Sequence, residues 1–328
     1  MSIKPYQTIE VRRDDLKHES ARALEKSLAI SSESASEIIN QFEYAELSGK
    51  RTHGFVRVPW LISQELGGDE PIVFERRGSD TDRISHIDCT RSIGYLALNQ
   101  ITDFVRDRAE QYGMHTAIIH NAFPTNTLGY YMRNLTAANG STGILLGSTP
   151  KLSSAPRDQK RIIGTNPLAI GVHDANTQLI TDITGAPSSF GEVLVAKYWG
   201  ELQLEHYRTS TGGRPRSIDD LFEDGEFTGY IEQKDDQKGD RKVYAISLAL
   251  QAMLSTLAGD RKGRGNMVMI AINAQTQEGN YLAPELIEGL KNEQLPGVMS
   301  HDRYNKALET PSIVIPEKLW NDICTTAR

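Results

Sequence analysis

Apolar residues recur at helical spacing in two parts of the chain. Residues 10–50 are predicted to be helical, and Ser31 or Ser32 would cap a helix there because a serine hydroxyl can accept a backbone N–H at a helix start. The inward positions of this helix recur until Gly49, and they are Ile38, Ile39, Phe42, Ala45 and Leu47. A second helix is predicted over 93–112 with Gly113 as its end, and its inward residues are Ile93, Leu96, Ile101, Phe104 and Val105.

After Gly113 the pattern changes to short apolar runs separated by Gly, Pro and Asn. These runs predict buried strands over 116–119, 143–147, 168–172, 179–182 and 267–273. A helix is predicted over 242–258. Residues 205–240 are charged and rich in glycine, so a long surface excursion is expected there.

This order of elements bears on the fold class. Helical segments at both ends enclose a mostly stranded middle, which predicts an α+β fold. Strands and helices do not alternate regularly from the N-terminus, so a doubly wound sheet is not expected. No internal repeat is present, which argues against a solenoid.

Composition narrows the class of protein. The chain has 328 residues, of which 38% are hydrophobic and 24% charged, as in ordinary globular proteins. The net charge of -7 offers no general attraction to nucleic acid or anionic lipid, so small molecules or other protein chains are the expected partners. The cysteines Cys89 and Cys324 have no metal-ligand spacing, and neither a signal peptide nor a membrane span is evident. A cytoplasmic protein without a metal site is expected.

The common nucleotide-binding motifs are missing. No Gly-x-Gly-x-x-Gly turn connects a strand to a helix, and 263–265 (GRG) precedes a predicted strand instead of following one. No P-loop, GxSxG elbow or HExxH helix occurs. A nucleotide, if bound, needs another kind of site.

The chemistry of residues 52–57 (THGFVR) suits a 2-oxoacid. Arg57 could pair with both oxygens of a carboxylate, and His53 could supply a proton as hydride reaches the carbonyl carbon. A histidine at a helix end beside a solvated arginine is the alternative interpretation, and spacing alone favours it.

Longer motifs add a resemblance. Residues 45–59 (AELSGKRTHGFVRVP) resemble the A-D-L-x-G-x-x-S-H-G-x-x-R-x-P signature of the malate/L-lactate dehydrogenase family. This family includes ureidoglycolate dehydrogenase, 2,3-diketo-L-gulonate reductase and Δ1-piperideine-2-carboxylate reductase. The likeness continues along nearly the whole chain, in 121–131 (NAFPTNTLGYY), 155–156 (AP), 164–167 (GTNP), 179–184 (LITDIT) and 241–246 (RKVYAI).

The resemblance implies a fold and an activity. The expected fold is not Rossmann-like: a largely antiparallel central sheet holds the nicotinamide cofactor, NAD or NADP, between helical N- and C-terminal segments. Residues 1–115 with 285–328 would form a helical, substrate-side domain, and 116–284 a sheet-rich cofactor domain. A homodimer acting on a small carboxylate substrate is implied as well.

Site residues follow from the same motifs. The catalytic residues would be His53, Arg57 and Asn121. The cofactor-binding residues would be Thr165, Asn166, Asp182, Ile183, Thr184 and Lys242. Lys242 has an argument of its own, because a cation at a helix start opposes the helix dipole unless an anionic ligand offsets it. The alternative for Asp182, Thr165 and Asn166 is an ordinary turn residue.

The chain also departs from the family pattern at the site. The family's second histidine falls on Pro124, which can neither transfer a proton nor donate a backbone N–H. Hydroxyl positions fall on Ala122, Gly185 and Ala186. The main hypothesis is an NAD(P)H-dependent reductase of a small 2-oxo- or 2-imino-carboxylic acid. A non-redox biosynthetic enzyme for an amino-acid-like substrate (elimination, isomerisation or condensation) and a non-catalytic metabolite-binding dimer are the alternatives.

Overall fold

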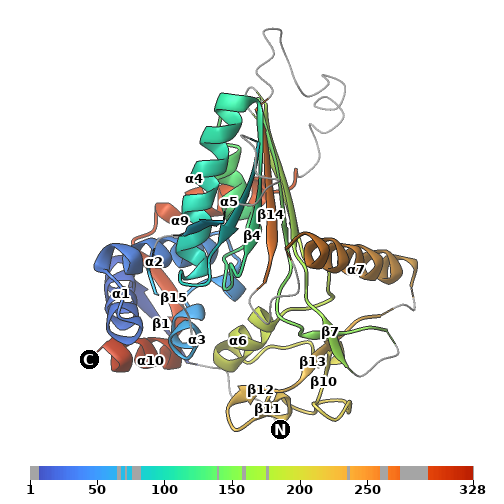
Figure 1. Cartoon of the computed structure of the whole chain (residues 1–328). Helices are drawn as coiled ribbons and strands as arrows, with labels where there is room; N and C mark the ends of the chain where they lie inside the picture. Colours follow the sequence, from blue (N-terminus) through green and yellow to red (C-terminus); the bar gives the residue numbers. More distant parts are fainter. Residues whose placement is uncertain are drawn as a thin grey trace.

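The N- and C-terminal segments form one helical layer. In the computed structural model, the residues described are 7–64, 68–70, 72–75, 83–138, 140–156, 160–174, 177–234, 237–258, 265–273 and 295–327. Strand β1 pairs antiparallel with β15, and helices α1, α2, α3 and α10 surround this pair (Figure 1). The bounds are β1 Thr8–Arg12, α1 Arg13–Leu28, α2 Ser32–Leu47, α3 Arg57–Ile62, α9 Val298–Leu308, β15 Ser312–Pro316 and α10 Glu317–Ala327.

Helix α2 confirms the prediction from spacing. The Ser31 side chain accepts the backbone N–H of Ser34 and so caps the helix. All five residues predicted to face inward are buried. Three of them, Ile38, Ile39 and Phe42, pack with α1 and α10 in a core that includes Leu16, Leu24, Leu319 and Ile323. This core fixes the end of α2, from which the chain enters the site.

A seven-stranded sheet forms the middle of the molecule. Its strand order is β2-β3-β4-β14-β5-β8-β9. Only β3 and β4 pair in parallel, and the other pairs are antiparallel. The predicted α+β class, with a largely antiparallel central sheet and no Rossmann arrangement, is confirmed. The bounds are β2 Val73–Glu75, β3 Ile84–Asp88, β4 Met114–His120, β5 Ser141–Gly147, β8 Leu168–Asp174, β9 Thr177–Ile183 and β14 Met267–Asn273.

Helices cover the two faces of this sheet unequally. On one face lie α4 (Gly94–Tyr112) and α5 (Leu128–Leu135), which bury a large apolar core. Helix α4 ends as predicted at Gly113, whose φ of 81° is the left-handed conformation that glycine adopts readily. On the other face lies α7 (Lys238–Ala258), which packs through few residues (Figure 1).

The expectation for 205–240 is wrong. Strands β10 (Tyr207–Arg208) and β13 (Tyr230–Glu232) join β6 (Ser153–Ser154) and β7 (Arg161–Ile163) in a four-stranded sheet. Strands β11 (Phe222–Glu223) and β12 (Glu226–Phe227) pair antiparallel in a separate hairpin, and they are short as well. Tyr207, Leu221 and Ile231 are fully buried and pack beside α6 (Phe190–Trp199). Strands of two or three residues are too short to give an alternating pattern, so the sequence suggested a loop.

The division into two domains stays a prediction. Strand β3 and helix α4 lie before the predicted boundary at 115, yet they belong to the sheet and to its core. No helix in the described residues is long and apolar enough to cross a membrane.

Candidate active site

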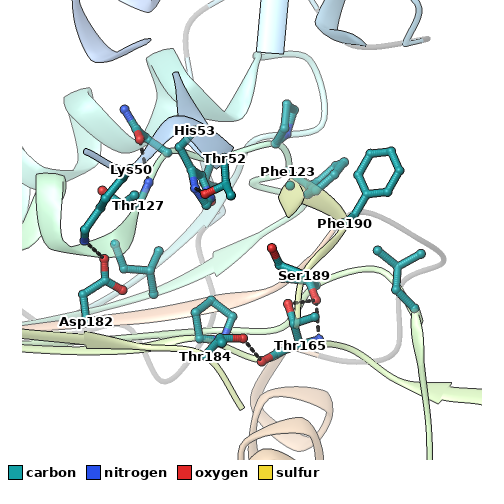
Figure 2. A pocket seen from close by; sticks show the side chains of 18 of the residues that line it. Lys50, Thr52, His53, Phe123, Thr127, Thr165, Asp182, Thr184, Ser189 and Phe190 are labelled. Atoms are coloured by element: carbon teal, nitrogen blue, oxygen red, sulfur yellow. Dashed lines mark hydrogen bonds and ion pairs between the residues drawn. The ribbon is translucent and has the colours of Figure 1, made fainter. Parts of the chain in front are cut away.

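A cavity of about 310 Å³ lies where the helical layer meets the central sheet. Its walls come from the turn after α2, the segment after β4, the end of β9 and the start of α6. Figure 2 shows Lys50 and Asp182 on one side, Phe123 and Phe190 on the other, and His53 with Thr52 between them. Segments far apart in the sequence therefore meet at one place.

Glu46 contacts the turn that carries His53. After α2 the chain passes through Gly49, at φ 79°, into the 3₁₀ turn Arg51–His53. A Cβ at Gly54 would overlap the Glu46 carboxylate, so the two residues are in close contact. The Phe55 backbone N–H donates to Glu46 Oε2 at 3.3 Å. Burial raises the pKa of Glu46 to about 7, although Arg51 and this hydrogen bond act in the opposite direction.

His53 is a neutral imidazole at pH 7. Burial lowers its pKa well below the ordinary value of 6.5, and the positive charges of Arg57 and Lys50 lower it further. Its Nδ1 lies 2.9 Å from Thr52 Oγ1, with which it shares a hydrogen bond. The ring can therefore take part in hydrogen bonds, but it does not hold an extra proton near neutral pH.

Arg57 is a buried cation that lacks an acidic partner within the described part of the chain. The residue is 7% exposed, and its Nε donates to the Thr52 carbonyl oxygen at 2.7 Å. Its guanidinium lies 4.7 Å from the Trp60 ring centroid. Burial lowers the pKa of Arg57, yet a guanidinium stays charged in a protein. Because buried charges are costly when unpaired, this one favours an anionic ligand in the cavity.

Asp182 and Lys50 form the second charged group of the site. Lys50 Nζ lies 2.9 Å from Asp182 Oδ2, which also accepts the Gly129 backbone N–H at 3.0 Å. The pair connects the turn of the helical layer to strand β9 (Figure 2). Each residue neutralises the other, so neither offers a free charge to a ligand.

Thr165 and Thr184 form a hydroxyl-bearing wall. Thr184 Oγ1 donates to the Thr165 carbonyl oxygen at 3.0 Å, and the Thr165 backbone N–H donates to Thr149 Oγ1 at 2.7 Å. Ile183 lies between Asp182 and Thr184 and is 48% exposed. The structure thus brings six of the nine predicted site residues to the cavity: His53, Arg57, Thr165, Asp182, Ile183 and Thr184.

The remaining three predicted residues lie elsewhere. Asn121 donates from Nδ2 to Asp88 and Thr90 at 3.0 and 2.8 Å and adopts a left-handed φ of 60°, so it shapes the turn after β4. Asn166 is fully buried, has a left-handed φ of 38° and donates to the Ser247 carbonyl oxygen at 2.9 Å. Both side chains are occupied by the scaffold, so the geometry does not support their expected roles.

Lys242 also lies outside the cavity. Helix α7 begins at Lys238, so Lys242 stands in its second turn and not at its start. The side chain is exposed. Because other residues form the first turn, the helix dipole gives no reason to expect an anionic ligand at Lys242, and its role in cofactor binding stays a prediction.

Sequence reasoning missed the contribution of α6. Ser189 caps this helix by accepting the Glu192 backbone N–H at 3.3 Å, and Ser189, Phe190, Gly191 and Glu192 all line the cavity. The S-x-x-E pattern signals a helix start, but it does not say what the start faces. The described residues contain no cluster of three or more His, Cys, Asp or Glu that could hold a metal ion.

Comparison with known proteins gives the family. The profile described as malate/L-lactate dehydrogenase matches residues 11–324. The chain belongs to the malate/L-lactate dehydrogenase family. One relative in this family is named as an NADP(+)-dependent dehydrogenase.

Individual relatives are distant. An L-sulfolactate dehydrogenase from Methanothermobacter thermautotrophicus is 23% identical over 66% of this chain and 61% of that protein, so this match spans less than two thirds of the relative. A (2R)-3-sulfolactate dehydrogenase (NADP(+)) from Chromohalobacter salexigens is 22% identical over 83% of this chain and 86% of its own. The crystal structure of a dehydrogenase from Sinorhizobium meliloti aligns with a TM-score of 0.80 at 21% identity and covers 98% of this chain and 99% of that one.

The cavity of this family member fits the nicotinamide end of the cofactor. The hydroxyls of Thr149, Thr165 and Thr184 suit the amide and ribose of such a nucleotide, and Phe123 with Pro124 offers an apolar surface for a flat ring. Among the described lining residues the cations are Lys50 and Arg57, and Lys50 is paired. Nothing in this wall distinguishes NADH from NADPH.

Proposed function

We propose that this chain is an NAD(P)H-dependent reductase of a small 2-oxo- or 2-imino-carboxylic acid. The observation that carries the proposal is the buried Arg57, which has no acidic partner among the described residues and lies in the same cavity as His53. A guanidinium recognises a carboxylate through two parallel hydrogen bonds, which fixes the plane of the substrate. The substrate's C2 atom then lies inside the cavity, away from bulk water.

The residues of the chain position and polarise the substrate, while the nicotinamide, when bound, supplies the hydride. With His53 Nδ1 accepting the Thr52 hydroxyl proton, Nε2 carries the ring hydrogen and can donate a hydrogen bond to the keto oxygen of a 2-oxo acid, whereas a protonated C=N has no lone pair to accept it. Phe123 and Phe190 keep water from that side of the cavity. Arg57 holds the carboxylate throughout, so binding and chemistry use separate groups.

Pro124 sets a limit on the acid chemistry. It lines the cavity where the family pattern has a second histidine, and His53 is the sole imidazole among the described lining residues. A neutral imidazole is a weak acid, and a well-placed acid contributes a factor of about 10²–10⁴ to such reductions. Malate, lactate and their oxoacids are therefore poor substrates, and an already protonated C=N is the better acceptor of hydride.

A homodimer is part of the proposal. Residues 243–258 contain no charged side chain, yet within the described structure α7 buries only Ser247, Leu254 and Ala258. Ile246 and Leu248 are 46% and 47% exposed. A helix that is apolar on most sides is normally covered, and a second copy of this chain related by twofold symmetry covers it here. We place the dimer in the cytoplasm, as its composition suggests.

Cofactor titration tests the redox function. NADH and NADPH are titrated separately into the purified protein, and nicotinamide fluorescence reports binding. Oxidation of the bound cofactor is then followed at its absorbance band with a panel of 2-oxo acids and cyclic 2-imino acids. Binding of at least one cofactor with turnover of one imino acid is expected. Binding of neither cofactor would favour the non-redox enzyme or the metabolite-binding dimer, both of which suit the loss of the second histidine.

A further inference from the structure

We propose that Glu192 selects the charge of the substrate, so that the site takes a molecule with one carboxylate and a cationic nitrogen and rejects a second anionic group. This inference rests on the proposed reductase function and narrows it to the 2-imino acids, bound as iminium ions. It departs from the substrates in the names of the sulfolactate dehydrogenases, which carry two anionic groups.

Among the described residues that line the cavity, one cation and one anion are left for the ligand. Lys50 and Asp182 neutralise each other at 2.9 Å. Arg57 and Glu192 line the same cavity without forming an ion pair with one another. His53 adds no charge, because burial keeps its pKa well below 6.5. A ligand that matches this arrangement has a negative and a positive group and no net charge.

Glu192 is brought close to the carboxylate site by the glycine before it. A Cβ at Gly191 would lie 3.0 Å from Arg57 Nη2 and 2.8 Å from Thr52 Cβ, so the start of α6 packs directly on the arginine and on the turn before His53. Glu192 follows in the same helical turn. A group attached to C2 of a substrate held by Arg57 is therefore near this carboxylate.

The position of Glu192 is fixed by hydrogen bonds from outside the cavity. Ser188 Oγ donates to Glu192 Oε2 and also contacts the Tyr207 hydroxyl, which donates to the Ser189 carbonyl oxygen at 2.8 Å. Tyr207 is fully buried in the small sheet formed by part of 205–240. Through Tyr207, this segment therefore helps to fix the position of the Glu192 side chain. The hydrogen bond from Ser188 uses only Oε2, and Glu192 lines the cavity.

Reduction of the iminium needs no proton donor at the reacting atoms. The hydride pair forms a C–H bond at C2, and the π electrons of C=N⁺ move to nitrogen as a lone pair. The product is a neutral amine that takes up its proton later from water, while the nicotinamide is oxidised. A 2-oxo acid instead becomes an alkoxide that needs a proton at once. A neutral His53 is a weak acid and Pro124 is no acid at all. The site therefore suits reduction of the iminium, which needs no proton donor, better than reduction of a 2-oxo acid.

The capping role of Glu192 does not account for its charge. Its backbone N–H caps α6 on Ser189, which any residue could do. The side chain accepts from Ser188, and a glutamine oxygen can also accept that bond. Glu192→Gln therefore preserves the fold and removes only the charge. Glu201→Gln, at an exposed residue outside this cavity, is the matched control.

Ligand binding measured by calorimetry tests Glu192 independently of turnover. The probes are proline, which has one carboxylate and a secondary ammonium, and malate, which has two carboxylates. Wild-type protein and Glu201→Gln should bind proline more tightly than malate. In Glu192→Gln the ratio of the two dissociation constants should shift toward malate by roughly ten- to hundredfold, the size of one charge interaction in a partly buried site. An unchanged ratio, or tighter malate binding by the wild type, would overturn the inference.

Turnover tests the proposed function separately. Reduction of 1-pyrroline-2-carboxylate is compared with reduction of pyruvate and oxaloacetate, using whichever cofactor binds. Faster reduction of the imine, with a preference lost in Glu192→Gln, supports both proposals. Turnover with a preference that Glu192→Gln leaves intact removes the role of Glu192 and keeps the reductase. A shifted binding ratio without any cofactor binding or turnover removes the reductase, and with it the iminium step, while leaving Glu192 as a selector of ligand charge.

Discussion

Lys50 and Asp182 are 132 residues apart in the chain, yet their side chains meet at 2.9 Å across the cavity. The pair joins the turn that carries His53 to the edge strand β9, whose end lines the cavity. It also removes one cation and one anion from the charges available to a ligand.

Breaking this pair should change ligand preference. Asp182→Asn keeps a side-chain oxygen for the Gly129 N–H but frees the charge of Lys50 in the cavity. Malate should bind about tenfold more tightly than in the wild type, because a second cation can now meet its second carboxylate. The loss in unfolding free energy should be about 1 kcal/mol at most, since Lys50 is partly exposed. Calorimetric titration and urea unfolding measure the two effects; unchanged malate affinity would contradict the pairing argument.

Arg57→Lys should weaken carboxylate binding although the charge is kept. A lysine cannot form the two parallel hydrogen bonds of a guanidinium, and losing one charged hydrogen bond costs about 2 kcal/mol. The Kd for proline should therefore rise by roughly thirtyfold. Arg51→Lys, at an exposed guanidinium of the same turn, is the control and should bind normally. Equal Kd values for Arg57→Lys and the wild type would place the carboxylate elsewhere.

How far the sequence could predict this site depends on what each residue needs from the rest of the chain. The strand 267–273 was predicted to the residue because it is a continuous apolar run between turns. His53 and Arg57 belong to one short motif, and both line the cavity. Glu192 could not be found, because its place depends on the packing of Gly191 against Thr52, which no local pattern encodes. The sequence pattern predicted a helix that starts at Lys242, whereas the helix starts a few residues earlier, at Lys238.

The exposed face of α7 should be a dimer contact. Ile246→Glu places a charge in the middle of the apolar face, where a dimer would have to bury it unpaired. Light scattering at micromolar concentration should give the dimer mass for the wild type and the mass of one 36.5 kDa chain for the variant. Thr256→Glu, at an exposed polar residue of the same helix, tests whether any new charge on α7 has this effect. A monomeric wild type would refute the assignment of this face.

Glu46→Gln should stabilise the protein at alkaline pH. The pKa of Glu46 is raised from 4.5 to about 7, so the native carboxyl holds its proton where the unfolded chain has lost it. Its contribution to stability is therefore full below pH 4.5 and is lost as the pH rises through about 7. Glutamine is never ionised and keeps an acceptor for the Phe55 N–H. The variant should gain on the order of 1–3 kcal/mol relative to the wild type at pH 8.5 and little or nothing at pH 5. Equal gains at both values would mean that the carboxyl is not the cause.

His53 should give the opposite pH dependence. Its pKa is lowered by burial first and by Arg57 and Lys50 next, so the native imidazole stays neutral below pH 6.5 while the unfolded chain takes up a proton. Above pH 6.5 both states are neutral and the residue adds no pH dependence. As the pH falls from 6.5 toward the lowered native pKa, proton uptake by the unfolded state favours unfolding, and stability is lost.

His53→Gln tests this dependence, because glutamine can still hydrogen-bond to Thr52 but does not titrate. Chemical unfolding of the two proteins is compared at pH 7.5, 6.5 and 5.5, so that titration of all other groups cancels in the difference. The gap in unfolding free energy should move in favour of the variant as the pH falls. A constant gap would show that His53 titrates as an ordinary histidine, and the lowered pKa would then no longer support the iminium preference.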